Sequence, residues 1–311
     1  SFSQFVQTSN NFNFPAFTYN NGLDLTITGS SGVTGTQTGT IACVGEAASE
    51  SRIITQGSGF TYAQNSRAIT APNMVVQTSV THTMTTGSIS VGALYGPTGG
   101  NVEFTTSTSA IFGSNTAYSL TVDGFFVNGA TSTFNAPSSS GTFTWSPSLT
   151  ADATADFDIN GTYTHDSGLL TCSGSNARRF LAGSATYYNV TMSGSGVLTQ
   201  SEAATIANVL TDSNNWTISG TTTTTLSGSG TPFVLSGTFT PGSASTVAYT
   251  GSSATDITGT TYYNVTANQS GTTFTQTGGV TANNNINITA GTWVKTDRAM
   301  TWPGTATVAG T

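Results

Sequence analysis

The hexapeptide TYYNVT stands at residues 186–191 and again at residues 261–266. Six identical residues in two places exceed what composition explains. The preceding segments match as well, since GTYT at 161–164 precedes the first copy at nearly the distance by which GTFT at 237–240 precedes the second. A weaker copy, TAYSLT at 116–121, keeps Thr, Tyr and Thr in register. Self-similarity at a fixed spacing is typical of repeat proteins, and here it predicts a unit of about 75 residues.

A shorter period runs inside this unit. SLTV at 119–122, WTIS at 216–219 and INIT at 286–289 alternate apolar and polar residues and are followed closely by Gly, which is typical of short strands. The spacing between GTFT at 141–144 and GTYT at 161–164 predicts a coil of about 20 residues, within the range of solenoids. The sequence therefore predicts an all-β fold, a β-solenoid or β-helix built of short strand repeats.

Composition supports strands and argues against helices. Only 6% of the residues are charged, against about 25% in ordinary globular domains, and 36 glycines interrupt nearly every window in which a helical period could develop. Hydrophobic residues make up 36% and alternate with Thr and Ser, which favours half-buried strands over disorder. One helical turn is expected in SEAATIANVL at residues 201–210, where Ser201 could cap it.

The repeat resembles a known class of proteins. TYYNVT, a following Gly/Ser/Thr stretch and a run that closes on AGT at 290–292 are similar to the strand repeats of large bacterial and archaeal surface proteins and of some virion fibres. Those repeats resemble haemagglutinin-like β-solenoids. The resemblance covers residues 105–311 and implies architecture and a location on a cell or virion surface. It identifies no catalytic residue.

The repeat is not legible before residue 105, which leaves two alternatives for residues 1–105. This region is either a separate β-sandwich or the same solenoid with divergent coils, and LDLTITG at 23–29 favours the solenoid because it shows the same strand followed by Gly. Residues 106–311 are predicted to form the repeat-built solenoid. The apolar segment at residues 1–17 is predicted to be an assembly arm that packs into a neighbouring subunit.

Charge restricts the partners. The net charge is −7 with a pI near 4.4, and the six basic residues form no patch beyond the pair Arg178 and Arg179. Nucleic-acid binding and recruitment to an anionic membrane both need clustered Lys and Arg, so neither is expected. No segment approaches the roughly 20 apolar residues of a membrane span, so we expect no membrane insertion. The start at Ser1, without an initiator Met, is expected of a processed chain.

One acidic segment is a candidate metal or catalytic site. Its carboxylates are Asp152, Asp156, Asp158 and Asp166. The oxygens of Asp156, Asp158 and Asn160 alternate as in the start of a calcium loop, but Ser167 stands where an EF-hand needs a bidentate Glu. The same two aspartates would be neighbours on one strand face, as a glycosidase pair requires, yet the segment offers few further acids or bases. A strand with its Asp side chains outward is the favoured interpretation.

Histidines and paired tyrosines are the other candidates. His82 and His165 stand in Thr-rich strand contexts, and an isolated surface or strand histidine is favoured over a base or a ligand. Adjacent strand residues face opposite ways, so one member of each pair, Tyr187 with Tyr188 and Tyr262 with Tyr263, must point inward. Core stacking is favoured over a sugar-binding ladder, although the outward members remain candidates for contact with a glycan or a neighbouring subunit.

The sequence leaves two covalent modifications undecided, a disulfide and glycosylation. Cys43 and Cys172 could form one disulfide of an exported protein or remain two buried thiols. Six Asn-x-Ser/Thr motifs are candidate glycosylation sites: Asn160, Asn189, Asn215, Asn264, Asn268 and Asn287.

We therefore expect an extracellular structural protein and not an enzyme. The first hypothesis is a self-assembling subunit of a surface filament, sheath or surface layer, whose partners are copies of itself. The second is a carbohydrate-binding adhesin, or a virion fibre that binds a receptor through surface glycans. A polysaccharide-cleaving β-helix enzyme is the third. No cofactor is expected.

Overall fold

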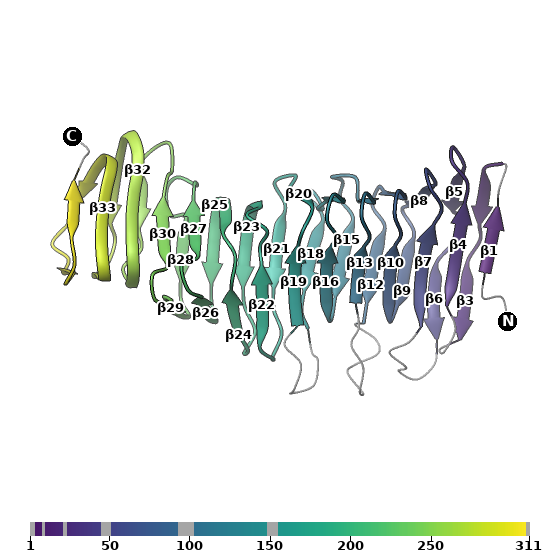
Figure 1. The fold of residues 1–311 in the computed structure, drawn as a ribbon, viewed down its shortest axis with the longest axis horizontal. Helices are drawn as coiled ribbons and strands as arrows, with labels where there is room; N and C mark the ends of the chain where they lie inside the picture. Colours follow the sequence, from purple (N-terminus) through teal and green to yellow (C-terminus); the bar gives the residue numbers. More distant parts are fainter. Residues whose placement is uncertain are drawn as a thin grey trace. The chain divides into compact units, whose positions relative to one another are not determined.

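The computed structural model describes residues 4–7, 10–20, 24–44, 51–92, 103–147 and 155–308. Strands make up 58% of the structure, no helix occurs among these residues, and parallel sheets stack as a β-solenoid of about 12 turns (Figure 1). Two compact units divide the chain, residues 1–176 and residues 177–311. Each is described by itself.

Unit 1 (residues 1–176) contributes three strands to each turn, one to each of three parallel sheets that we name A, B and C. Sheet A holds β1 (Gln4–Gln7), β4 (Leu25–Gly29), β7 (Arg52–Gln56), β10 (Asn73–Val76), β13 (Glu103–Thr106), β16 (Phe125–Asn128) and β19 (Ala155–Ile159). Sheet B holds β2 (Phe12–Phe14), β5 (Thr34–Gln37), β8 (Thr61–Asn65), β11 (Thr81–Met84), β14 (Ile111–Phe112), β17 (Thr133–Asn135) and β20 (Thr162–Thr164). Sheet C holds β3 (Phe17–Asn20), β6 (Ile41–Val44), β9 (Ala68–Ala71), β12 (Ser88–Val91), β15 (Ser119–Val122), β18 (Thr142–Trp145) and β21 (Leu169–Cys172). Of the two alternatives for residues 1–105, the described residues therefore form the solenoid and not a separate sandwich.

Unit 2 (residues 177–311) continues with parallel strands of more varied length. One sheet holds β22 (Arg178–Leu181), β24 (Val197–Gln200), β26 (Asn215–Ile218) and β29 (Thr238–Thr240). The remaining strands are β23 (Thr186–Met192), β25 (Ala204–Asp212), β27 (Thr223–Leu226), β28 (Phe233–Leu235), β30 (Thr246–Tyr249), β31 (Thr255–Ile257), β32 (Thr261–Gln276), β33 (Val280–Val294), β34 (Met300–Thr301) and β35 (Ala306–Val308). The helical turn expected at residues 201–210 is wrong: most of that segment is β25, whose alternating buried residues Ala204 and Ile206 suit a strand.

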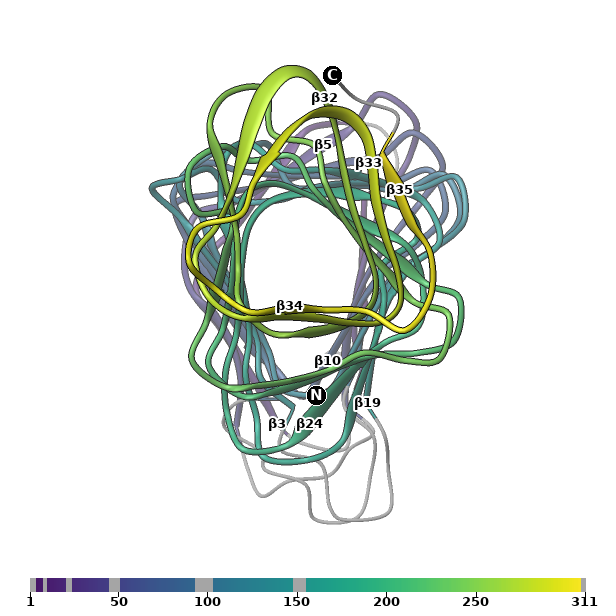
Figure 2. The ribbon, with the colours of Figure 1, turned by 90° about the vertical axis from the view of Figure 1, so that its left-hand side faces the viewer.

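The core of each unit lies inside its turns, where the apolar side chains are buried. Figure 2 shows the turns end on, as closed loops of backbone. Strand register places inward side chains of successive turns above one another at about 4.8 Å, which suits the stacking of aromatic rings. One inner column of sheet A runs through Leu25, Ile53, Met74, Phe104, Phe126 and Phe157. Phe126 stacks on Phe104 with ring centroids 5.3 Å apart and on Phe157 at 4.8 Å.

The corner between sheets A and B repeats a four-residue β-turn. Its closing hydrogen bonds run from Val33 N to Ser30 O, Phe60 N to Gly57 O, Val80 N to Gln77 O, Ala110 N to Ser107 O and Ser132 N to Gly129 O. The third residue is left-handed each time, as Gly32, Gly59, Ser79, Ser109 and Thr131. Glycine adopts this conformation without steric cost, so Gly32 and Gly59 suit the first two corners. Ser79, Ser109 and Thr131 adopt it at a steric cost, which the other interactions of the turn must offset.

Turn length differs between the units. Paired residues of sheet A in unit 1 lie 22, 28, 21, 30, 22 and 31 positions apart along the chain, so short and long turns alternate. In unit 2 the offsets are 18 to 23 positions, which confirms the predicted coil of about 20 residues there. The spacing between residues 141–144 and 161–164 was no measure of a coil, because the first segment belongs to sheet C and the second to sheet B.

Candidate functional site

The acidic segment lies on β19 with its carboxylates outward. Phe157 and Ile159 are buried, while Asp156 and Asp158 alternate with them on the opposite, partly exposed face. Asp166 follows β20 in an exposed turn, and Asp152 lies outside the described residues. Strand β19 thus has its Asp side chains outward, which is the arrangement that the sequence favoured. Within the described part of the chain, no three His, Cys, Asp or Glu side chains gather as a metal site would require.

His82 is a core residue of sheet B. It is fully buried on β11 between Tyr62 and Phe112, with ring centroids 4.8 and 4.9 Å away. The side chain of Gln64 donates through Nε2 to Arg67 O and Ser88 O, so its Oε1 must accept from His82 Nε2, at 2.9 Å. Burial lowers the pKa of His82 to about 3, and the imidazole is therefore neutral at pH 7.

His165 lies elsewhere and does not converge with His82. It is partly exposed after β20, where its Nδ1 accepts a hydrogen bond from Ser167 N at 3.3 Å. The two histidines are thus separate, as expected of isolated residues, but only His82 lies in a strand, and the strand context expected for His165 is wrong because β20 ends at Thr164.

Buried glutamines lock consecutive turns together, a device that sequence reasoning missed. Gln37 Nε2 donates to Gly39 O in its own turn and to Ala68 O in the next, at 2.8 and 2.9 Å, while its Oε1 accepts from Tyr62 OH at 2.8 Å. Gln64 repeats this pattern with the partners named above. Each lock ties three groups across two turns and leaves no polar atom of the amide unpaired.

Two further glutamines occupy similar positions at the ends of strands in unit 2. Gln200 Nε2 donates to Glu202 O, and its Oε1 accepts from Thr224 Oγ1, both at 2.9 Å. Gln276 Nε2 donates to Gly278 O and to Ala299 O, at 2.6 and 2.7 Å. Its Oε1 differs from those of the other three, because it is buried and accepts no hydrogen bond from the part of the chain described.

The repeat tyrosines divide as expected, and the structure identifies the inward members. Tyr187 and Tyr262 are buried, whereas Tyr188 and Tyr263 are partly exposed. Tyr187 OH donates to Ala182 O at 3.1 Å, and Tyr262 OH donates to a backbone carbonyl at 2.7 Å. The hexapeptides are therefore core strands, each with one tyrosine outside.

The two hexapeptides occupy different columns of unit 2. Register carries Tyr187 to Ile206, Leu226, Tyr249 and finally Ala267. Ala267 lies five residues beyond Tyr262 on the same strand, so Tyr188 and Tyr263 are not stacked above one another. The outward tyrosines consequently form no ladder along which a glycan chain could stack.

The cysteines are buried in sheet C, Cys43 on β6 and Cys172 on β21. Strands β9, β12, β15 and β18 lie between them. Five strand spacings amount to about 24 Å. A disulfide needs Cα atoms within about 7 Å, so this fold does not allow the two to pair within one chain.

The candidate glycosylation sites differ in accessibility. Asn160, Asn215 and Asn268 are exposed. Asn189 and Asn264 instead join asparagine ladders, in which Asn189 Oδ1 accepts from Asn208 at 2.8 Å and Asn264 Oδ1 accepts from Asn284 at 2.9 Å. Asn287 is partly exposed on β33. Use of any of these sites remains a prediction.

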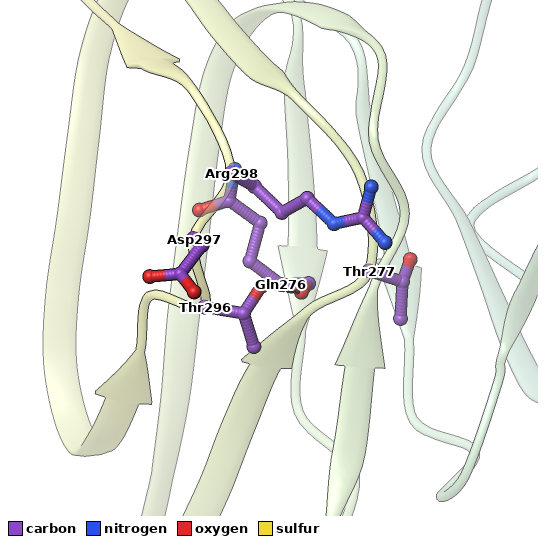
Figure 3. A pocket seen from close by; sticks show the side chains of 5 residues that line it. All are labelled: Gln276, Thr277, Thr296, Asp297 and Arg298. Atoms are coloured by element: carbon purple, nitrogen blue, oxygen red, sulfur yellow. Dashed lines mark hydrogen bonds between the residues drawn. The ribbon is translucent and has the colours of Figure 1, made fainter.

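An open hollow of about 580 Å³ lies in unit 2 where β32 and β33 end (Figure 3). It is lined by Gln276, Thr277, Thr296, Asp297 and Arg298. The side chains of Asp297 and Arg298 point to opposite sides of Gln276. Both are exposed, and neither forms an ion pair with another described residue. The hollow therefore combines a carboxylate, a guanidinium, two hydroxyls and the unpaired amide oxygen.

No protein family, no curated protein and no solved structure matches this chain. Within the described residues, no helix is long and apolar enough to cross a membrane.

Proposed function

We propose that this chain is a self-assembling structural subunit of an extracellular filament, sheath or surface layer. The observation that supports it is the outward chemistry of sheets B and C in unit 1. One outward rank of sheet B runs through Thr34, Thr61, Thr81, Ile111, Thr133 and Thr162. A rank of sheet C runs through Thr18, Ala42, Thr70, Ser90, Thr121, Thr144 and Thr171. Neither rank contains a charge.

Charges on outward strand positions are the usual means by which sheet proteins avoid associating with one another. Sheet A has such charges, with Arg52, Asp156 and Asp158 at outward positions of its strands. Sheets B and C lack them, and their ranks repeat at the strand spacing of about 4.8 Å. A second copy has the same period, so its hydroxyl and methyl groups can pack between those of the first.

Electron microscopy of the purified chain over a range of concentrations tests this proposal. Ordered filaments or sheets are expected as the concentration rises. A chain that sediments as a monomer at every concentration, with an intact β-type circular dichroism spectrum, would contradict the structural role.

A further inference from the structure

The hollow between the ends of β32 and β33 has features of a ligand site that the proposed structural role does not use. Gln276 is 1% exposed, yet its Oε1 has no donor in the described part of the chain. The comparable oxygens of Gln37, Gln64 and Gln200 each accept one O–H or N–H from the following turn. An unpaired buried carbonyl destabilises the fold, so a group that donates to it would bind favourably.

The charges around Gln276 restrict the chemistry of that group. Asp297 accepts hydrogen bonds only and Arg298 donates only. The hydroxyls of Thr277 and Thr296 already donate to Ile257 O and Gln276 O, at 3.2 and 3.0 Å, so toward a ligand they act as acceptors. A small anion would meet the Asp297 carboxylate, and a small cation would meet the Arg298 guanidinium. A neutral ligand with neighbouring hydroxyls satisfies both, because each hydroxyl can donate to the carboxylate or to Gln276 and accept from the guanidinium.

We propose that this hollow binds a neutral sugar unit of a polysaccharide, with Asp297 and Arg298 as the paired acceptor and donor and Gln276 Oε1 as a second acceptor. The site is open on one side, which suits one unit of a long chain better than an enclosed small molecule. The proposal is independent of self-assembly, which rests on sheets B and C of the other unit.

Affinity electrophoresis of the full chain tests the proposal, through gels that contain the neutral polymers dextran, mannan, arabinogalactan or laminarin and through one that contains anionic polygalacturonate. Retardation by at least one of these neutral polymers is expected. Asp297→Ala and Arg298→Ala should each weaken it by about tenfold or more, since each removes a charge-assisted hydrogen bond. Lys295→Ala is the matched control, because this exposed cation is adjacent in sequence but does not line the hollow. Its retardation should equal that of the wild type.

Three results would overturn the proposal. They are no retardation by any neutral polymer, retardation that survives both substitutions, and retardation only by anionic polygalacturonate that depends on Arg298 and not on Asp297. All three positions are exposed, so circular dichroism and melting temperature should match the wild type in every variant. If filaments form while no sugar binds, the structural role stands and this inference fails.

Discussion

Asp212 is a buried carboxylate at the end of β25. Its Oδ1 accepts a hydrogen bond from Asn214 N at 3.0 Å, whereas Oδ2 is buried with no hydrogen-bond partner in the described part of the chain. Burial raises the pKa of Asp212 from 3.8 to about 6, and the hydrogen bond from Asn214 offsets only part of that effect. The folded chain therefore binds this proton more tightly than the unfolded chain does. The contribution is favourable below pH 4 and is lost as the pH rises through 6.

Asp212→Asn should stabilise the chain at pH 7.5, because it removes the cost of ionising a buried group. The rise in the pKa from 3.8 to about 6 corresponds to an upper bound of about 3 kcal/mol, and screening by solvent lowers the expected gain below that bound. The free energy of unfolding, measured by urea titration at several pH values, should show a gain at pH 7.5 that shrinks toward zero near pH 4. Asp256→Asn, at a partly exposed position, is the control for loss of one charge. An equal gain at both pH values would mean that ionisation is not the cause.

At the scale of single residues, the sequence predicted which way a side chain points better than it predicted which groups the side chain contacts. Alternation placed Phe157 inward and Asp158 outward because a strand permits only two faces. It could not assign which tyrosine of a pair was inside, since bulges in β23 and β32 shift the register there. The glutamine locks were missed, although Gln37 and Gln276 share a readable signal: each ends a strand, and Gly follows two positions later.

Strand β23 gives the element scale its clearest test. Tyr187 is fully buried with its ring 5.2 Å from that of Phe180, while Tyr188 on the same strand is partly exposed. Tyr187→Ala should cost about 3–5 kcal/mol, because it leaves a cavity and removes the hydrogen bond to Ala182. Tyr188→Ala should cost less than about 1 kcal/mol. Urea unfolding of the two variants checks this, and similar small losses for both would show that β23 is not a core strand.

Strands could be predicted where the alternation of apolar and polar residues alone determines them. The strands of residues 119–122 and 216–219 follow from alternation. The segment at 201–210 was misassigned because Ser201 and Glu202 match a helix start locally, whereas pairing of β25 with β23 and β27 determines the outcome. The two copies of TYYNVT are both strands, but their different columns depend on bulges and turn lengths that no short motif encodes.

At the scale of the whole molecule, the inward faces of the strands serve the stacking of turns, and an outward face is the proposed surface for association between copies. Inner columns hold the turns of each unit together, and the outward rank of sheet B in unit 1 is free of charge. Seven strands at about 4.8 Å, each about 10–13 Å long, give a face of roughly 400 Å². A stable protein contact buries about 800 Å² per partner. One such face is therefore too small for a stable dimer, and association through it must rely on many contacts formed together.

This reasoning predicts that charges on sheet B prevent assembly without unfolding the chain. Thr61→Lys combined with Thr133→Lys places two ammonium groups on the outward rank, and burying them against a second copy would leave them unpaired, at a cost of several kcal/mol. Light scattering and electron microscopy should show assembly of the wild type and none of the double variant.

The control is Thr26→Lys with Val127→Lys, which adds the same charge to outward positions of sheet A. Because sheet A already carries charged residues, the control should assemble as the wild type does. Assembly of the sheet B variant would show that this face makes no lateral contact, and equal loss in both variants would show that net charge, not the face, governs association.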